Sequence, residues 1–289
     1  MYDGLLTLIA LADAGTMTRT ALRLRVSQST ISKRIASLEA EVGEALVEPD
    51  GRRVRLTPRA RALVSRAGPL LQELRAILED APATSGGRLT IGVSESILSS
   101  WGAAQLRRAA ADVPGLELEL HAHRSPVAIE RVRAGEYQLA LVAGRATQLE
   151  GLVSRPLLKE AMVIVPSGLE PLRLSKRRPV EVIAIEPHAE TWSALRGGLA
   201  RLRRERGLRL ESAHRLESFA GIVQMARAGF GQGLVPEGIA RAMGVPAKRL
   251  VHLPRPGLTR PVHLIARRRT WERPLADALY VALREVLAR

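Results

Sequence analysis

The 289-residue sequence contains no cysteine, which excludes disulfide bonds and metal sites built on thiolates. It has no apolar run close to the roughly 18 residues that a helix needs to cross a bilayer. The N-terminal segment carries an acid at Asp3 and lacks a basic region, so we expect no signal peptide and a cytoplasmic location. With 46% apolar residues, a chain of this length can form two or three domains with cores of their own.

Sequence signals for catalysis are sparse. Neither of the common glycine-rich phosphate loops occurs. The segment GVSES at residues 92–96 has part of a nucleophile elbow, but it lacks the final glycine and has no assignable aspartate and histidine partners. His121 and His123 share one face of an expected strand, yet two histidines alone make a poor metal site. We therefore expect no enzyme activity, no metal site and no cofactor.

Acidic residues are too few to balance the basic ones, and the net charge is +15. Residues 1–80 hold 12 basic and 10 acidic residues, a net charge of +2, so the other +13 lies in residues 81–289. Arginine outnumbers lysine forty to four. A basic balance can indicate nucleic-acid binding, but this excess is not concentrated in one short domain, so only motifs can decide the question.

The stretch VSQSTISKRIASLE at residues 26–39 is rich in short polar side chains, which are mediocre helix formers because they compete for backbone hydrogen bonds. Ile31, Ile35 and Leu38 nevertheless recur at helical spacing, and Ser27 can cap the helix. Two shorter apolar patterns precede it, and the first ends near Gly15. Thr16 or Thr18 can cap the second of these helices, and the turn RLRV follows it. Helix, short helix, tight turn and longer helix together predict a helix-turn-helix.

The polar residues of this third helix lie beside its apolar stripe, where a recognition helix contacts base edges in the major groove. Glutamine pairs with adenine and serine with several bases, whereas lysine and arginine reach phosphates. The alternative is a solvated face on a small helical domain. The residues that we expect to contact DNA are Ser27, Gln28, Ser29, Thr30, Ser32, Lys33 and Arg34.

Residues 46–58, LVEPDGRRVRLTP, read as a hairpin, because an Asp-Gly pair separates two short β-prone runs. Such a wing places Arg52 and Arg53 on the DNA backbone or in the minor groove. An ordinary basic hairpin is the alternative, above all for Arg55.

An apolar heptad pattern follows Pro58, and it favours a helix that pairs with a second copy of the chain. One helix-turn-helix grips a single half-site, so a two-fold dimer fits the pattern better than packing within one subunit, which remains the alternative. We expect Gly68 and Pro69 to interrupt this helix and kink it. The seam consists of Ala60, Leu63, Ala67, Leu70, Leu74 and Ile77.

The segment GTMTRTALRLRVSQSTISKRIASLEAEVG at residues 15–43, with the wing and the long helix, resembles the LysR-type transcriptional regulators of bacteria. That family usually has Ser-Phe-Thr where this chain has Thr16, Met17 and Thr18. After the recognition helix the family usually has Leu-Phe-x-Arg, whereas residues 46–49 here are Leu-Val-Glu-Pro. The resemblance implies a winged helix-turn-helix, and the missing arginine puts one phosphate contact in doubt.

Beyond the small-residue segment at residues 80–87, expected strands and helices alternate, which predicts an α/β domain with a mostly parallel sheet. The repeated RAG before Gln-containing strands suggests two similar subdomains, with AMVIVP and PVHLIA crossing between them and Thr270 capping a final helix. Chance similarity is the alternative, because glycine is common after a helix. The resemblance implies an effector domain of two lobes, similar to periplasmic binding proteins. The expected division is a DNA-binding domain at 1–57, a linker and dimerisation helix at 58–80, a hinge at 81–87 and an effector domain at 88–289, with a first lobe at about 88–160 and 267–289 and a second at about 161–266.

Ligands of such sheets bind beyond the carboxyl ends of the strands, in the cleft between the lobes. Every residue that we select there is also explained as an ordinary turn or helix cap. Arg124 suits a carboxylate, which favours a small organic anion or an amino acid, whereas Glu95 suits an amine, and a zwitterion reconciles the two. The expected effector contacts are Ser94, Glu95, Ser96, Arg124, Pro187, His188, Thr191 and Phe219.

The family resemblance implies a transcriptional regulator gated by a small-molecule effector. Its expected partners are double-stranded DNA with an inverted-repeat operator, the effector, RNA polymerase and further copies of the chain in a homodimer or homotetramer, with no membrane. The alternative is an exported-type solute-binding protein, or an enzyme that uses the cleft. An exported protein needs a signal peptide, so the N-terminal segment argues against that alternative.

Overall fold

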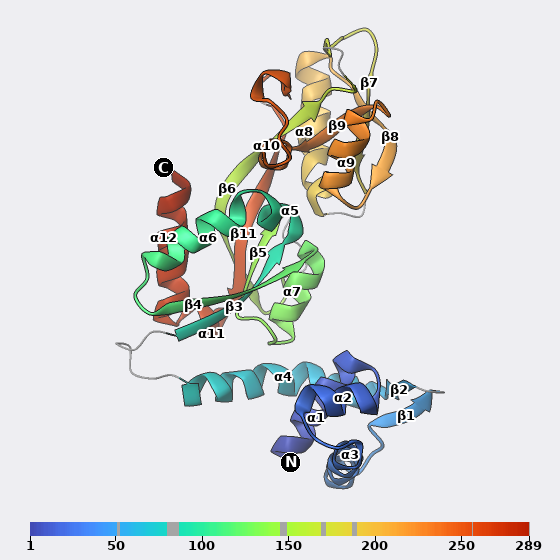
Figure 1. The fold of residues 1–289 in the computed structure, drawn as a ribbon, viewed down its shortest axis with the longest axis vertical. Helices are drawn as coiled ribbons and strands as arrows, with labels where there is room; N and C mark the ends of the chain where they lie inside the picture. The colour runs from blue at the N-terminus through green and yellow to red at the C-terminus, as the bar shows by residue number, and fades with distance from the viewer. Residues whose placement is uncertain are drawn as a thin grey trace. The chain divides into compact units, whose positions relative to one another are not determined.

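The structure is a computed structural model that describes residues 1–50, 53–79, 87–144, 149–168, 172–186, 190–255 and 257–288 (Figure 1). The chain forms two compact units, one made mainly of residues 1–82 and the other of residues 83–132 and 137–289. Among the described helices, none has the length and apolar character required to cross a membrane.

The first unit is a winged helix-turn-helix, as the sequence predicts. Its second helix is capped by Thr16, whose hydroxyl accepts a hydrogen bond from the Arg19 N–H at 3.2 Å. Arg25 adopts a positive φ of 54° and turns the chain into the third helix, which Ser27 caps. The elements are α1 (Tyr2–Ala14), α2 (Met17–Leu24), α3 (Gln28–Val42), β1 (Val47–Asp50), β2 (Arg53–Leu56) and α4 (Pro58–Glu79).

The core of this unit joins α1, α3, the start of the wing and the first turn of α4. Leu8 and Leu11 from α1 pack with Ile35 and Leu38 from α3, all nearly inaccessible to solvent. Ala60 from α4 is fully buried in the same cluster. The N-terminal end of α4 is therefore anchored to the rest of the first unit.

Helix α4 departs from the predicted seam in two ways. It runs unbroken through Gly68 and Pro69, so the predicted interruption is wrong. A proline removes only one backbone N–H donor, and the other backbone hydrogen bonds of the helix keep the chain helical. Ala60 and Leu63 pack inside their own domain, so the first part of the pattern is a core stripe. Leu70 is 61% exposed, and the side chains at 74 and 77 lie outside the described residues.

The second unit is built on one mixed sheet with the strand order β4-β3-β5-β11-β6-β9-β7-β8, and β10 pairs with β6. The pairs β3–β4, β3–β5, β7–β8 and β7–β9 are parallel, whereas β11 and β6 run antiparallel to their neighbours. The strands are β3 (Gly87–Ser94), β4 (Leu116–His123), β5 (Leu139–Ala143), β6 (Leu152–Val165), β7 (Val180–Ile185), β8 (Leu210–Leu216), β9 (Gln232–Pro236), β10 (Val251–His252) and β11 (Thr259–Arg267).

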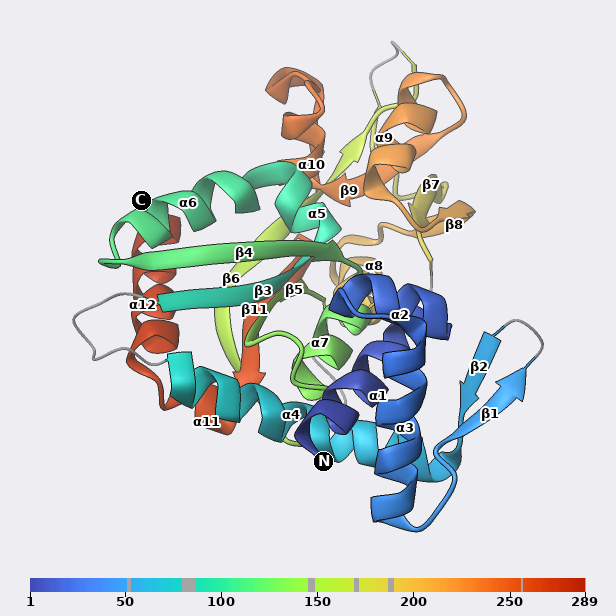
Figure 2. The same ribbon diagram turned by 60° about the horizontal axis from the view of Figure 1, so that its bottom comes forward.

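Helices cover both faces of this sheet and form two lobes with separate cores. Figures 1 and 2 show α6 and α12 side by side on one face of the first-lobe strands, with α7 on the other. The helices are α5 (Glu95–Ile97), the π-helical turn η1 (Leu98–Gly102), α6 (Ala103–Ala111), α7 (Ser125–Arg133), α8 (Glu190–Arg206), α9 (Phe219–Arg227), α10 (Glu237–Ala242), the 3-10 turn η2 (Ala247–Arg249), α11 (Arg268–Trp271) and α12 (Pro274–Ala288).

Strands β6 and β11 connect the lobes, as expected for AMVIVP and PVHLIA. Strand β6 pairs with β11 up to Ala161 and with β9 from Met162 onward. Val262 and Leu264 of β11 pack in the core of the first lobe, so the expected lobe border near residue 267 does not follow the packing. Thr270 is buried inside α11 and does not cap the last helix, because a separate helix begins at Pro274, a residue preorganised for a first helical turn.

Candidate functional site: a recognition helix and an interlobe pocket

The exposed face of α3 carries three of the predicted DNA contacts with unpaired side chains. Gln28, Ser32 and Lys33 are exposed, and within the described part of the chain their side chains make no hydrogen bond or ion pair. The hydroxyl of Ser27, in contrast, is already engaged, because it accepts a hydrogen bond from the Thr30 N–H at 3.1 Å. It also lies 2.8 Å from the hydroxyls of both Ser29 and Thr30, so these three residues form the helix cap.

The predicted arginine contacts divide into three groups. Arg34 is paired with Asp3 of α1, with Nη2 and Oδ2 2.8 Å apart, so this arginine ties α3 to α1. Arg55 pairs with Glu48 across the wing at 2.7 Å, as the ordinary-hairpin alternative implies. Arg52 lies outside the described residues, and Arg53 is described only through its backbone in β2.

The role of Glu39 was not predicted from the sequence. Its Oε1 accepts hydrogen bonds from the backbone N–H groups of Leu46 and Val47, at 2.7 and 3.1 Å. The last turns of α3 therefore hold the start of the wing. An acidic residue on the inner side of α3, shortly before the turn, was the only sequence signal.

A pocket of about 570 Å³, including its open mouth, lies between the lobes of the second unit. Its walls come from the carboxyl ends of β3, β4, β5, β7 and β8 and from the helices that follow them, as expected for an open α/β sheet. Six of the eight predicted contacts line it together: Ser94, Glu95, Ser96, Arg124, Thr191 and Phe219. The other two, Pro187 and His188, lie outside the described residues.

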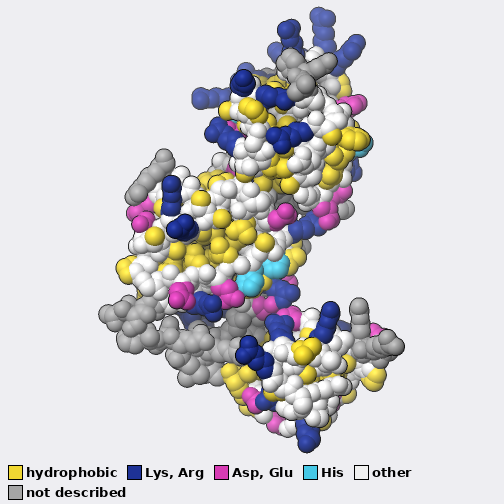
Figure 3. Space-filling view, viewed as in Figure 1, with side chains coloured by type: hydrophobic (Ala, Val, Ile, Leu, Met, Phe, Trp, Pro, Cys, Tyr) yellow, Lys and Arg dark blue, Asp and Glu magenta, His cyan; other side chains and the backbone are white. Residues whose placement is uncertain are grey.

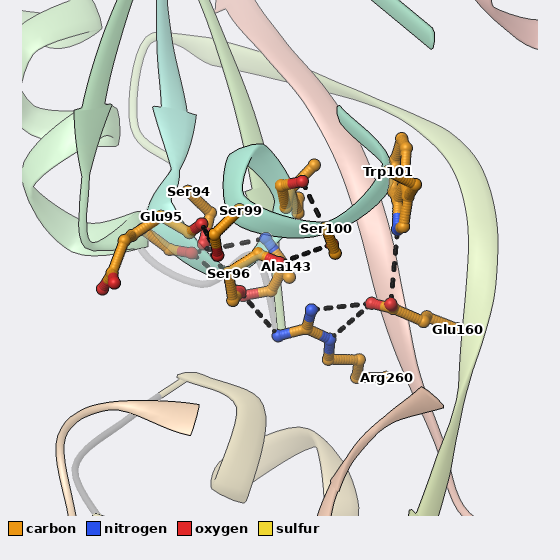
Figure 4. A network of polar contacts seen from close by, with 11 residues as sticks. Ser94, Glu95, Ser96, Ser99, Ser100, Trp101, Ala143, Glu160 and Arg260 are labelled. Atoms are coloured by element: carbon orange, nitrogen blue, oxygen red, sulfur yellow. Dashed lines mark hydrogen bonds and ion pairs between the residues drawn. The ribbon is translucent and has the colours of Figure 1, made fainter. Parts of the chain in front are cut away.

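The most buried charge at this pocket belongs to Arg260, which is 1% exposed and was not predicted. Its Nε donates to Oε2 of Glu160 at 2.8 Å, and its Nη1 donates to the Ser96 hydroxyl at 2.9 Å (Figure 4). Nη2 lies 2.6 Å from the same Glu160 oxygen, but it is buried without a hydrogen-bond partner among the described residues. The guanidinium carbon lies 5.2 Å from the centre of the Phe219 ring.

The network around Arg260 continues into the helical turn η1. The other carboxylate oxygen of Glu160 accepts a hydrogen bond from the indole N–H of Trp101 at 3.3 Å. Burial lowers the pKa of Arg260, and the neighbouring Glu160 carboxylate opposes this shift. Since arginine keeps its proton even in such surroundings, the pocket wall holds a charged guanidinium paired with the Glu160 carboxylate.

Arg124, the predicted anion clamp, is paired. Its Nη1 donates to Oε1 of Glu217 at 2.8 Å, which joins a residue after β4 to a residue after β8 at the rim of the pocket. Both side chains are about half exposed or more. Glu95 is also exposed, and in Figure 4 its carboxylate points away from Arg260. The rim therefore holds mixed charges, and the buried cation lies deeper.

Two family models match the chain. One, described as the LysR substrate binding domain, matches residues 82–288, and the other, described as a bacterial regulatory helix-turn-helix protein of the lysR family, matches residues 2–61. The chain belongs to the LysR family of transcriptional regulators. This confirms the resemblance noted in the sequence and the winged helix-turn-helix and two-lobed α/β fold expected from it.

Relatives of this LysR-type regulator match most or all of its length. An uncharacterized HTH-type transcriptional regulator of Vibrio cholerae is 26% identical over 100% of this chain and 97% of its own. The transcriptional activator IlvY of Salmonella typhimurium is 28% identical over 96% and 97%. A probable hydrogen peroxide-inducible genes activator of Mycobacterium avium is 30% identical over 81% and 77%.

Solved structures of full-length LysR-type proteins share this fold. A full-length OxyR from Pseudomonas aeruginosa superposes with a TM-score of 0.71 at 19% identity, covering 98% of this chain and 97% of that one. CbnR, a LysR family transcriptional regulator, has a TM-score of 0.67 at 19% identity and covers 99% of both chains. CbnR complexed with its target DNA has a TM-score of 0.64 at 20% identity, again over 99% of both.

Proposed function

We propose that this LysR-type regulator binds an inverted-repeat DNA operator as a dimer or tetramer, and that a small carboxylate effector in the interlobe pocket controls it. The effector class is an organic anion or an amino acid. CbnR bound to its target DNA, and a full-length LysG from Corynebacterium glutamicum with the bound effector Arg, support the two kinds of partner.

The observation that carries the effector proposal is the guanidinium of Arg260, which lies buried in the wall of the pocket and has five N–H donors. Its contacts with one oxygen of Glu160 and with the Ser96 hydroxyl leave N–H donors that an anion in the pocket can engage. A guanidinium presents a planar fork that matches a carboxylate. The Ser96 hydroxyl already lies 2.9 Å from Nη1 and can share the ligand.

The remaining wall of the pocket suits a compact ligand of mixed character. Ile185, Phe219 and Ile239 supply apolar surface, and the acidic side chains of Glu95 and Glu217 lie at the rim. A carboxylate on Arg260 and an amine near the rim carboxylates accommodate an amino acid. An organic anion without an amine would bind through the contact between its carboxylate and Arg260 alone.

Thermal unfolding of the full-length protein with carboxylates, amino acids and amines tests the effector proposal. A ligand that binds only the folded state raises its melting temperature by mass action. Arg260→Lys keeps the charge beside Glu160 but loses the fork, so we expect about tenfold weaker binding of carboxylate hits. Arg124→Ala is the matched control, because this arginine lies at the exposed rim of the pocket and not in its buried wall, and the variant should keep the shift.

Two results contradict the effector proposal. If carboxylates shift the wild type and Arg260→Lys equally while circular dichroism shows both folded, Arg260 is not the anion site. If only neutral apolar compounds bind, the effector is not an anion.

The DNA proposal assigns base reading to Gln28 and Ser32 and backbone contact to Lys33, since these three side chains are exposed and unpaired on α3. Arg52 and Arg53 of the wing are proposed as further backbone contacts. Gln28→Ala should lower operator affinity by about 1–3 kcal/mol with little effect on random DNA. Lys33→Ala should weaken both DNAs alike and reduce the slope of affinity against salt by about one unit.

The readout for DNA binding is a titration of operator and random duplexes over a range of salt concentrations. Equal weakening of both duplexes by Gln28→Ala would contradict its role as a base reader. A footprint of one isolated half-site bound by a monomer would contradict the inverted repeat.

A further inference from the structure

One end of the second lobe carries a dense group of basic side chains that neither the recognition helix nor the pocket uses. In Figure 3 the dark blue lysine and arginine side chains gather on this lobe at its end away from the first lobe. All members are exposed and come from three segments. This group, called the basic edge, consists of Lys176, Arg177, Arg178, Arg203, Arg204, Arg206, Arg209 and Arg255.

Backbone contacts bring these three segments together. Strands β7 and β8 are parallel and begin side by side, because the Val180 N–H donates to the Arg209 carbonyl at 2.8 Å. The side chain of Lys176 packs beside Gly207, 3.8 Å from where a Cβ would stand there. The Nε of Arg206 donates to the Arg255 carbonyl at 2.8 Å. The basic edge is therefore one surface, at the amino ends of β7 and β8.

The basic edge lies at the opposite end of these strands from the pocket. Ile185, the last residue of β7, and Glu217, directly after β8, line the pocket. A strand of six residues spans about 20 Å, so a ligand in the pocket does not reach the basic edge. A partner of the basic edge is thus a second partner of this lobe.

Local structure explains only part of this charge. Arg203, Arg204 and Arg206 lie in the last turn of α8, where cations interact favourably with the helix dipole. Arg204 also contacts Glu205 at 3.5 Å. Neither effect applies to Arg177 and Arg178, whose side chains make no ion pair or hydrogen bond among the described residues.

Carboxylates near the basic edge do not cancel it. Besides Glu205, Glu181 and Glu211 lie opposite each other one residue into β7 and β8, and both are exposed. These three acids stand against eight cations, so a clear positive excess remains. Fixed cations at this density attract a polyanion, and releasing its condensed counterions drives the binding.

We propose that the basic edge binds the phosphate backbone of duplex DNA, without reading sequence, as a contact separate from that of α3. Seven of its eight members are arginines, whose planar forks grip phosphate oxygens bidentately. A membrane surface fits less well, since interfacial binding also needs apolar side chains to insert. The exposed large apolar side chains of the described chain all lie in other segments.

Site-specific crosslinking on the full-length protein tests the contact directly. The chain has no cysteine, so one introduced cysteine takes a photo-crosslinker at a single position. Arg203→Cys and Arg177→Cys report on the basic edge. Arg108→Cys is the matched control, because Arg108 is exposed and also lies in the last turn of a helix. With a random-sequence duplex of a few helical turns, we expect several-fold more DNA crosslinking from positions 203 and 177 than from 108.

A charge-matched pair of variants gives an independent readout. The triple variant Arg177→Gln, Arg178→Gln, Arg203→Gln removes three charges from the basic edge. The control Arg107→Gln, Arg108→Gln, Arg268→Gln removes three exposed charges from the first lobe. For random duplex DNA, the slope of log affinity against log salt should fall by about 2–3 units in the first variant, at about 0.9 per lost phosphate contact, and stay near wild type in the control.

Three outcomes would overturn the proposal. Crosslinking from 203 and 177 that does not exceed the control shows that the basic edge does not touch DNA. Equal salt slopes in the two triple variants show that net charge alone matters. Capture of added RNA polymerase in place of DNA assigns the surface to an acidic protein. Equal urea midpoints of the variants and the wild type verify that every protein is folded.

Discussion

The wall of the pocket contains a buried ion pair between Arg260 and Glu160. Arg260 and Glu160 stand opposite each other in the antiparallel register of β11 and β6. Both are at least nine-tenths buried, so each depends on the other for charge compensation. Removing one partner of such a pair leaves an uncompensated charge in a poorly solvated site.

Glu160→Ala should therefore lower the free energy of unfolding of the second unit by about 3–5 kcal/mol. The double variant Glu160→Met, Arg260→Met removes both charges and should recover most of this loss. All three tryptophans lie beyond residue 82, so urea unfolding followed by tryptophan fluorescence reports on this unit alone. A double variant as unstable as the single one would show that packing, and not the unpaired charge, causes the loss.

A site residue can be predicted from the sequence when neighbouring residues in the chain determine its position. Ser94 and Ser96 follow a recognisable strand at the start of a helix, so their place at the pocket could be predicted. Arg260 acquires its role from Glu160, 100 residues earlier, through strand register that no local pattern encodes. Arg124 lines the pocket, but its pairing with Glu217 of the other lobe depends on the same long-range geometry.

At the scale of elements, the side chain of Glu39 connects the recognition helix to the wing. Its carboxylate accepts two backbone hydrogen bonds from the start of β1. The hydroxyl of Thr57, just after β2, donates to the Ala45 carbonyl at 3.0 Å and accepts from the Ala60 N–H. Both ends of the hairpin are thus fixed to the helices beside it.

Glu39→Ala should speed amide hydrogen exchange at Leu46 and Val47 and cost about 1.5–3 kcal/mol of domain stability, because it deletes an ionised acceptor of two bonds. Glu39→Gln keeps an acceptor oxygen and should retain most of the protection. Glu44→Ala, on an exposed residue 3.9 Å from Arg59, is the neutral control. Unchanged exchange in Glu39→Ala would mean that the wing holds its shape without this carboxylate.

Element boundaries were predictable where a cap or a turn defines them. Thr16 and Ser27 begin their helices as expected, because an N-cap acts within three residues. The heptad pattern of α4 was ambiguous, since apolar residues at this spacing pack equally well within a subunit or between two. Ala60 and Leu63 pack within their own domain, whereas Leu70 is exposed.

At the scale of the whole molecule, the exposed Leu70 makes the proposed oligomer testable. Leu70→Asp places a charge in the remaining apolar stripe of α4, where an interface would have to bury it at high cost. Sedimentation should then show a shift toward monomer, with a loss of operator affinity. Ser65→Asp, an exposed change elsewhere on the same helix, should leave both unchanged. An unaltered sedimentation coefficient for Leu70→Asp would remove α4 from the interface.

The position of β11 in the sheet has a consequence for how the chain is made. This strand lies between β5 and β6, although more than ninety residues separate the end of β6 from its first residue. During synthesis, β5 and β6 of the first lobe lack the strand that pairs with both of them until residue 267 has left the ribosome. By then β7 can already pair with β8 and β9. The part of the domain that is translated first is thus completed last, and its open strand edges need protection in the meantime.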